Sequence, residues 1–169
     1  MSAYTFFASE YPLTAVPNPY LESFSINDML AHNMEIPDFL KESDLFKTID
    51  RNMTIMVRYK TEDGADEINI YLTEPGPQTA YYTSKKYIAC LEWKYSERRA
   101  EELLDYIREH LQEADELELW SIYLEDHDTP ELLKYTLDDL TIEPLRLMFQ
   151  DSRYTRPRCL RVRKENETV

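Results

Sequence analysis

Carboxylates recur at four-residue intervals in the central part of this chain of 169 residues. A helix rises about 1.5 Å per residue, so such carboxylates stand about 6 Å apart along one face. Like charges at this spacing repel each other, so the row does not stabilise its own helix. We expect the row to bind a cationic protein; the alternative is a solvated face that keeps the chain soluble. The row and its continuation are Glu97, Glu101, Asp105, Glu109, Glu113 and Asp115, and Glu116 and Glu118 add to the same expected anionic surface.

Tyrosines add a second candidate feature for binding. The chain has 13 of them, and Tyr81 and Tyr82 fall in a predicted loop over residues 73–85. Interfaces favour tyrosine because it brings a large contact area at a low entropic cost. Tyr81 and Tyr82 therefore join the carboxylates as predicted partner-binding residues. The alternative is that these rings only cover an edge of the core.

Motifs for catalysis or for cofactors are missing from the sequence. Gly64 and Gly76 are the only glycines, which excludes a glycine-rich phosphate loop, and no G-x-S-x-G motif occurs. His32 and His110 lie in helical segments without a recognisable catalytic partner. Residues 125–128 are four consecutive potential metal ligands, and they predict a polar turn and no metal site. We predict no catalytic residue, metal or cofactor and favour a non-enzyme, while an active site assembled from scattered residues stays open.

The net charge of −14 bears on the class of partner. Such a field repels nucleic acids and anionic lipids and attracts cationic proteins. Residues 151–169 differ from the rest because they hold six Lys and Arg against three acidic residues. We expect this basic end to pair with the chain's own acidic body, and a local anion site is the alternative. A third hypothesis is that Arg161 and Arg163 contact an anion or nucleic acid from one face of a strand.

The two cysteines, Cys90 and Cys159, fall in strand-like segments among aliphatic residues. They predict buried free thiols in a reducing compartment, with a single bridge between them left open. The amino-terminal residues lack the basic and apolar regions of a signal peptide, and apolar runs stop far short of a membrane span. We therefore expect a cytoplasmic protein with no membrane partner.

Periodicity predicts the elements that position these residues. The longest helix is expected over 97–113, after Ser96 as N-cap, with apolar residues at i, i+3, i+4 and i+7 forming one buried stripe. Shorter helices are predicted over 26–32, from Pro37 to about residue 46 with a break at Ser43, and over 141–149. Strands are predicted over 4–8, 53–61, 68–72, 87–95, 116–124, 132–137 and 159–163.

The order of these elements predicts an α+β fold. We expect a single domain over 1–169, with a mostly antiparallel sheet of about five to seven strands, three or four helices packed on it, and a basic C-terminal strand and tail from about residue 151. A tight hairpin at Asp63 and Gly64 should join the strands over 53–61 and 68–72. The strand over 87–95, apolar on both faces, should be central.

Charge and the absence of motifs together favour an acidic protein-binding module without catalytic activity. A specific version is an inhibitor of a cationic toxin or nuclease, similar in role to an immunity protein or antitoxin. The rival hypothesis is an enzyme or small-ligand-binding protein with a pocket at the sheet edge, walled by the loop at residues 75–77. The identity of the partner and the oligomeric state stay open, and a homo-oligomer is among the possibilities.

Overall fold

The computed structural model describes residues 3–124, 127–150 and 156–165. The chain divides into two compact units. Unit 1 comprises Met1–Asn18 and Asp66–Val169, and unit 2 comprises Pro19–Ala65. The expectation of one domain over residues 1–169 stays a prediction.

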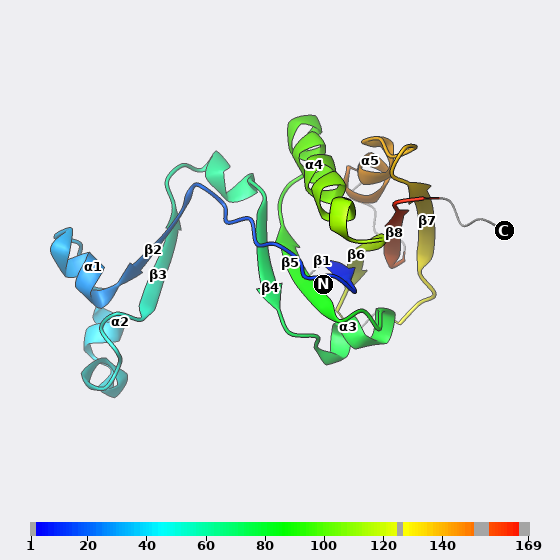
Figure 1. Ribbon diagram of the computed structural model, residues 1–169. Helices are drawn as coiled ribbons and strands as arrows, with labels where there is room; N and C mark the ends of the chain where they lie inside the picture. Colours follow the sequence, from blue (N-terminus) through cyan, green and yellow to red (C-terminus); the bar gives the residue numbers. More distant parts are fainter. Residues whose placement is uncertain (1–2, 125–126, 151–155, 166–169) are drawn as a thin grey trace. The chain divides into compact units, whose positions relative to one another are not determined.

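Six strands of unit 1 form a single sheet in the order β4-β5-β1-β6-β8-β7 (Figure 1). Neighbouring strands are antiparallel except β7 and β8, which are parallel. The predicted central strand, β5, lies between β4 and β1 and is confirmed as central. The strands are β1 (Ala3–Ser9), β4 (Asn69–Thr73), β5 (Tyr87–Glu92), β6 (Glu116–Tyr123), β7 (Glu131–Thr136) and β8 (Arg158–Arg163).

Each face of this sheet has its own core, because successive side chains of a strand point to opposite faces. On one face, helices α4 (Glu97–Glu113) and α5 (Glu143–Phe149) cover Phe7, Ala89, Leu91, Leu119 and Leu160. On the other face, Tyr82 of helix α3 (Pro77–Tyr82) packs near Phe6, Ala8, Ile88, Trp120 and Cys159. Helices α4 and α3 therefore lie on opposite sides of the sheet (Figure 1).

Helix α4 has the bounds that the sequence predicts. The Ser96 side chain accepts a hydrogen bond from the Arg99 amide at 3.2 Å, which satisfies one of the unpaired amides of the first turn. The apolar stripe is fully buried against the sheet and consists of Ala100, Leu103, Leu104, Ile107 and Leu111. Burial of this stripe leaves the acidic row on the opposite, exposed side of the helix.

Unit 2 is built on a two-stranded antiparallel sheet of β2 (Leu21–Ser25) and β3 (Thr54–Tyr59). Helix α1 (Ile26–Ala31) begins after Ser25, whose side chain accepts from the Asp28 amide while the Asp28 carboxylate accepts from the Ser25 amide. Helix α2 (Asp38–Lys41) follows Pro37, and the 3-10 helix η1 (Asp44–Lys47) follows Ser43. The predicted cap and the predicted break are both confirmed. A small core holds Phe24, Ile26, Met29 and Ile36.

The predicted hairpin at Asp63 and Gly64 is wrong. Strand β3 pairs with β2 and β4 pairs with β5, and residues Asp63–Asp66 form a 3-10 helix, η2, between them. Tight hairpin turns need a positive φ, which Gly64 does not have. Glycine stands here for a different reason, because a Cβ atom at Gly64 would lie 2.6 Å from the Cβ of Tyr20.

Two further elements differ from the predictions. Residues 77–82, predicted as loop, form helix α3, which begins at Pro77 and whose Gly76 amide donates to the Thr79 side chain at 3.0 Å. Strand β2 was not predicted, because its partner β3 lies about thirty residues further along the chain.

The predicted α+β class with a mostly antiparallel sheet is confirmed. The described residues form eight strands and five α-helices, and four of those helices were predicted.

Candidate functional site

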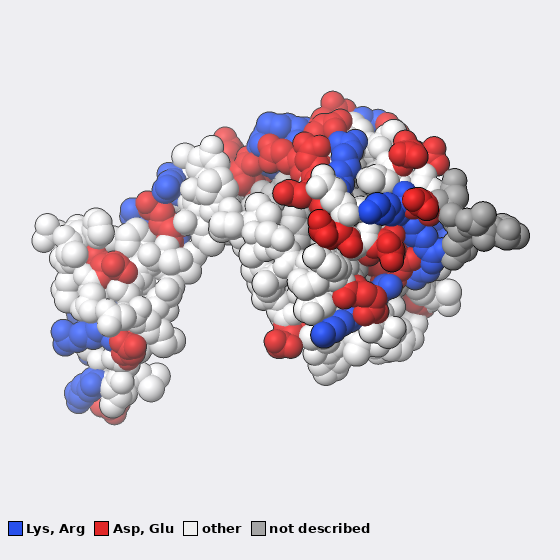
Figure 2. All heavy atoms as spheres, viewed as in Figure 1, with Lys and Arg blue, Asp and Glu red and all other residues white. Residues whose placement is uncertain are grey.

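The six predicted acidic residues of α4 and of the turn after it are all exposed. Figure 2 shows Asp and Glu side chains gathered over α4, with Lys and Arg side chains among them. Glu97 pairs with Arg146 at 2.8 Å, and Asp105 pairs with Arg108 at 2.9 Å. Within the part of the chain that the structure describes, no cation pairs with Glu101, Glu109, Glu113 or Asp115. Three of these four carboxylates, Glu109, Glu113 and Asp115, lie in the C-terminal half of α4 or just after it, and Glu101 lies nearer its N-terminus.

The basic C-terminal strand pairs with other carboxylates. Arg161 binds Glu118 at 2.8 Å and Arg163 binds Glu116 at 2.6 Å, both across the β6–β8 ladder. Arg158 binds Glu131 of β7 at 3.1 Å. The expected pairing of the basic end with the chain's own acidic body is thus confirmed for these arginines, and it does not reach the α4 row. Arg153 and the other residues of 151–155 lie outside the described residues.

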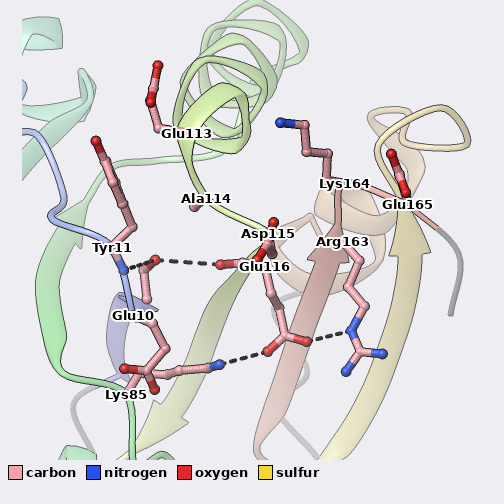
Figure 3. Close-up of a pocket in the computed structure, with 11 residues that line it drawn as sticks. Glu10, Tyr11, Lys85, Glu113, Ala114, Asp115, Glu116, Arg163, Lys164 and Glu165 are labelled. Carbon is pink, nitrogen blue, oxygen red and sulfur yellow. Dashed lines mark hydrogen bonds and ion pairs between the residues drawn. The ribbon is translucent and has the colours of Figure 1, made fainter.

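A pocket of about 780 Å³ lies beside the C-terminal end of α4 (Figure 3). Glu116 stands in it between Lys85 at 2.9 Å and Arg163 at 2.6 Å. Burial raises the pKa of Glu116, but the hydrogen bonds from Arg163 and Lys85 outweigh burial and hold that pKa below its usual range. The pocket is lined by Ser9, Glu10, Tyr11, Lys85, Glu113, Ala114, Asp115, Glu116, Arg163, Lys164 and Glu165.

The cations of this pocket already have acceptors. Lys85 and Arg163 bind Glu116, and the Lys164 ammonium donates to the Gln112 carbonyl at 3.0 Å. Four other carboxylates of the lining have no cationic partner in the described ranges, and these are Glu10, Glu113, Asp115 and Glu165. The last carbonyls of α4 add the negative end of the helix dipole to the same region. The pocket can therefore attract a cationic group more readily than an anion.

A buried Ser9 and His110 pair ties the end of β1 to α4. The Ser9 hydroxyl oxygen lies 2.8 Å from Nε2 of His110 and accepts a hydrogen bond from the Tyr11 amide at 3.0 Å. Burial lowers the pKa of His110, which favours the neutral imidazole. Both residues are buried, so the pair helps to hold the end of β1 against α4. Sequence reasoning missed this pair because its members lie 101 residues apart.

The buried Glu118 forms the other polar centre of unit 1. Its carboxylate accepts hydrogen bonds from Thr83 at 2.8 Å, Trp120 Nε1 at 2.9 Å and Arg161 at 2.8 Å. These donors join the segment after α3 to β6 and β8 on one face of the sheet. Such a fully satisfied carboxylate stabilises the fold and offers no free group to a ligand.

Tyr81 and Tyr82 do not lie with the acidic row. Tyr82 packs on Trp120, with ring centroids 5.4 Å apart, and this contact is on the face of the sheet opposite α4. Tyr81 is 56% exposed and its hydroxyl donates to the His127 carbonyl at 3.1 Å. The predicted partner-binding residues therefore separate into two groups, one over α4 and one over α3.

A second pocket, of about 570 Å³, has Pro75 in its wall, whereas Gly76 and Pro77 of the same predicted loop are not among its lining residues. Apolar side chains provide much of its lining. It contains Pro12, Leu13, Leu72, Thr73, Glu74, Pro75, Lys86, Tyr87 and Ile88.

The remaining candidate groups are the potential metal ligands and the two cysteines. No group of three or more potential metal ligands converges among the described residues, and residues 125–126 of the predicted polar turn lie outside them. Cys90 and Cys159 are both buried free thiols, so the bridge left open by the sequence does not form. Burial raises the pKa of the Cys159 thiol, which disfavours a reactive thiolate.

Comparison with known proteins finds no matching family model, no similar curated protein and no similar solved structure. Among the described residues, no helix is both long and apolar enough to span a bilayer.

Proposed function

We propose that this protein is a non-catalytic module that binds a cationic protein through the exposed side of α4 and the pocket beside the C-terminal end of this helix. The observation that carries the proposal is the set of exposed carboxylates without a cationic partner at Glu101, Glu109, Glu113 and Asp115. The arginines of β8 do not neutralise these carboxylates, because they bind carboxylates of β6 and β7. Such a surface accelerates encounter with a positively charged partner.

A more specific version is an inhibitor of a cationic toxin or nuclease, in the manner of an immunity protein or antitoxin. Carboxylates arranged along a helix can occupy a surface that otherwise binds phosphates, because both groups offer anionic oxygens to Lys and Arg. We also propose a cytoplasmic location, and the two buried free thiols support it because free thiols are typical of a reducing compartment.

The test compares two variants with the same net charge. One carries Glu101→Gln, Glu109→Gln, Glu113→Gln and Asp115→Asn. The control carries Glu35→Gln, Glu42→Gln, Glu62→Gln and Glu74→Gln, at residues that are also exposed and have no described cationic partner. Binding of a dye-labelled decalysine peptide is measured by fluorescence anisotropy at low salt.

At about 0.5 kcal/mol per exposed ion pair, loss of the α4 carboxylates should weaken decalysine binding roughly 30-fold. The control should stay within about threefold of the unmodified protein, since its charges lie elsewhere. Equal losses in both variants would show that only net charge matters, and the α4 site would then be abandoned.

A small-ligand-binding protein or enzyme is the second candidate, and the two pockets favour it. Thermal stabilisation by an uncharged small molecule would support this candidate if Leu72→Glu, which places a charge in the apolar pocket, abolished it. If no compound in a broad metabolite set stabilises the protein, the result would favour the protein-binding proposal.

A further inference from the structure

The outer edge of β7 has backbone groups without a hydrogen-bond partner among the residues that the structure describes. The Glu131 amide donates to the Pro157 carbonyl and the Leu137 amide to the Arg163 carbonyl, each at 2.8 Å. Alternate residues of β7 therefore face β8, and the amides and carbonyls of Leu132 and Lys134 point away from it. Within the described ranges these four groups have no hydrogen-bond partner.

On the opposite edge of the same sheet, strand β4 has backbone groups that are hydrogen-bonded to a covering segment. On β4, the Ile70 amide and carbonyl both bind Val16, at 2.8 and 2.9 Å. The Asn69 side chain accepts from the Asn18 amide at 3.2 Å. Proteins commonly protect an open edge with a proline, a bulge or a covering segment. Strand β7 contains no proline, and its register with β8 is regular.

The side chains of β7 are complementary to a second copy of the strand. In an antiparallel pair with Leu133 on a two-fold axis, Leu132 stands opposite Lys134 and Glu131 stands opposite Tyr135. No like charges meet in this register, and Leu133 meets its own copy at the closely spaced central position. Centring the pair on Lys134 would oppose two ammonium groups, which is unfavourable.

We propose that two copies of this protein associate through their β7 edges in the register centred on Leu133. The pairing satisfies the free amides and carbonyls of Leu132 and Lys134 and covers Leu132, which is 44% exposed in the single chain. The two sheets then continue across the two-fold axis. Because each copy has a net charge of −14, the association strengthens when salt screens the repulsion.

Analytical ultracentrifugation of the full chain tests this proposal. Sedimentation at concentrations up to about 1 mM, in about 50 mM and about 500 mM NaCl, should show a monomer–dimer equilibrium that tightens with salt. Lys134→Pro removes an amide that points away from β8 and has no partner in the described part of the chain, and it should weaken dimerisation at least about tenfold. Lys134→Gln keeps the amide and should dimerise within about threefold of the unmodified protein.

Amide hydrogen exchange gives a second measurement that needs no variant. The amides of Leu133 and Tyr135 should be protected at every concentration, and those of Leu132 and Lys134 only as the dimer forms. A monomer at the highest concentration and salt overturns the proposal, as does a dimer that Lys134→Pro leaves unchanged while folded. Protection at Leu132 and Lys134 only after addition of another protein would assign the edge to a different chain.

These outcomes are independent of the proposed function, because binding of a cationic protein weakens with salt whereas this dimer strengthens.

Discussion

Glu118 provides the sharpest test of what stabilises unit 1. Its side chain is 4% exposed, and three donors from different segments, Thr83, Trp120 and Arg161, bind its carboxylate. Removal of one partner from a buried ion pair costs about 3–5 kcal/mol, because the other charge is left without compensation. Arg161 keeps 27% of its side-chain exposure, so the lower end of this range applies.

Glu118→Ala should therefore lower the free energy of unfolding by about 3 kcal/mol, equivalent to roughly 6–12 °C in Tm for a chain of this size. Glu118→Gln should cost about half as much, since the amide oxygen still accepts from Trp120. Urea denaturation, followed by tryptophan fluorescence and circular dichroism, measures both changes. Glu113→Ala, at an exposed carboxylate of α4, is the control and should stay within about 0.5 kcal/mol. A cost below about 1 kcal/mol for Glu118→Ala would refute the role assigned to this network.

Three further predictions concern other parts of the molecule. Gly64→Ala should destabilise the protein by about 1–3 kcal/mol in urea denaturation, because the added Cβ would clash with Tyr20. The control Gly76→Ala has open space around its Cβ and should change the free energy of unfolding by less than about 0.5 kcal/mol. Equal effects of the two variants would contradict the steric explanation. The lowered pKa of His110 means that the unfolded chain binds a proton more readily than the folded one, so Tm should fall as the pH drops below about 6.5. His110→Gln should reduce that dependence between about pH 7.5 and 5.5, and an unchanged profile would assign it to other groups. Cys90 and Cys159, both buried, should react with a thiol reagent only after unfolding, and a fast reaction in the native protein would disprove their burial.

Local signals predicted the helices better than the strand pairing. Ser96 and the apolar stripe after it fixed the ends of α4, because a cap and a 3.6-residue period are both contained within the segment. The Asp63 and Gly64 pair led to the wrong prediction of a hairpin, because a turn motif does not specify which strands pair. Strands β3 and β4 pair with β2 and β5 and not with each other. Pairing between distant strands depends on packing that one segment does not specify.

The candidate site was predicted in part. The exposed row on α4 followed from helical spacing, but the pocket and the network around Glu118 depend on contacts between distant strands. One signal for that network was present in the sequence. Glu116 and Glu118 are spaced by two residues, as are Arg161 and Arg163, which is the spacing needed for ion pairs on one face of neighbouring strands.

The most direct test of the proposed binding surface is a titration of the ¹⁵N-labelled protein with decalysine, observed by NMR. The amide shifts should change most along the exposed side of α4 and in the turn at Glu113 and Asp115, and these changes should diminish at high salt. Changes that are largest in unit 2, or spread evenly over the acidic residues of the whole chain, would contradict a binding surface on α4.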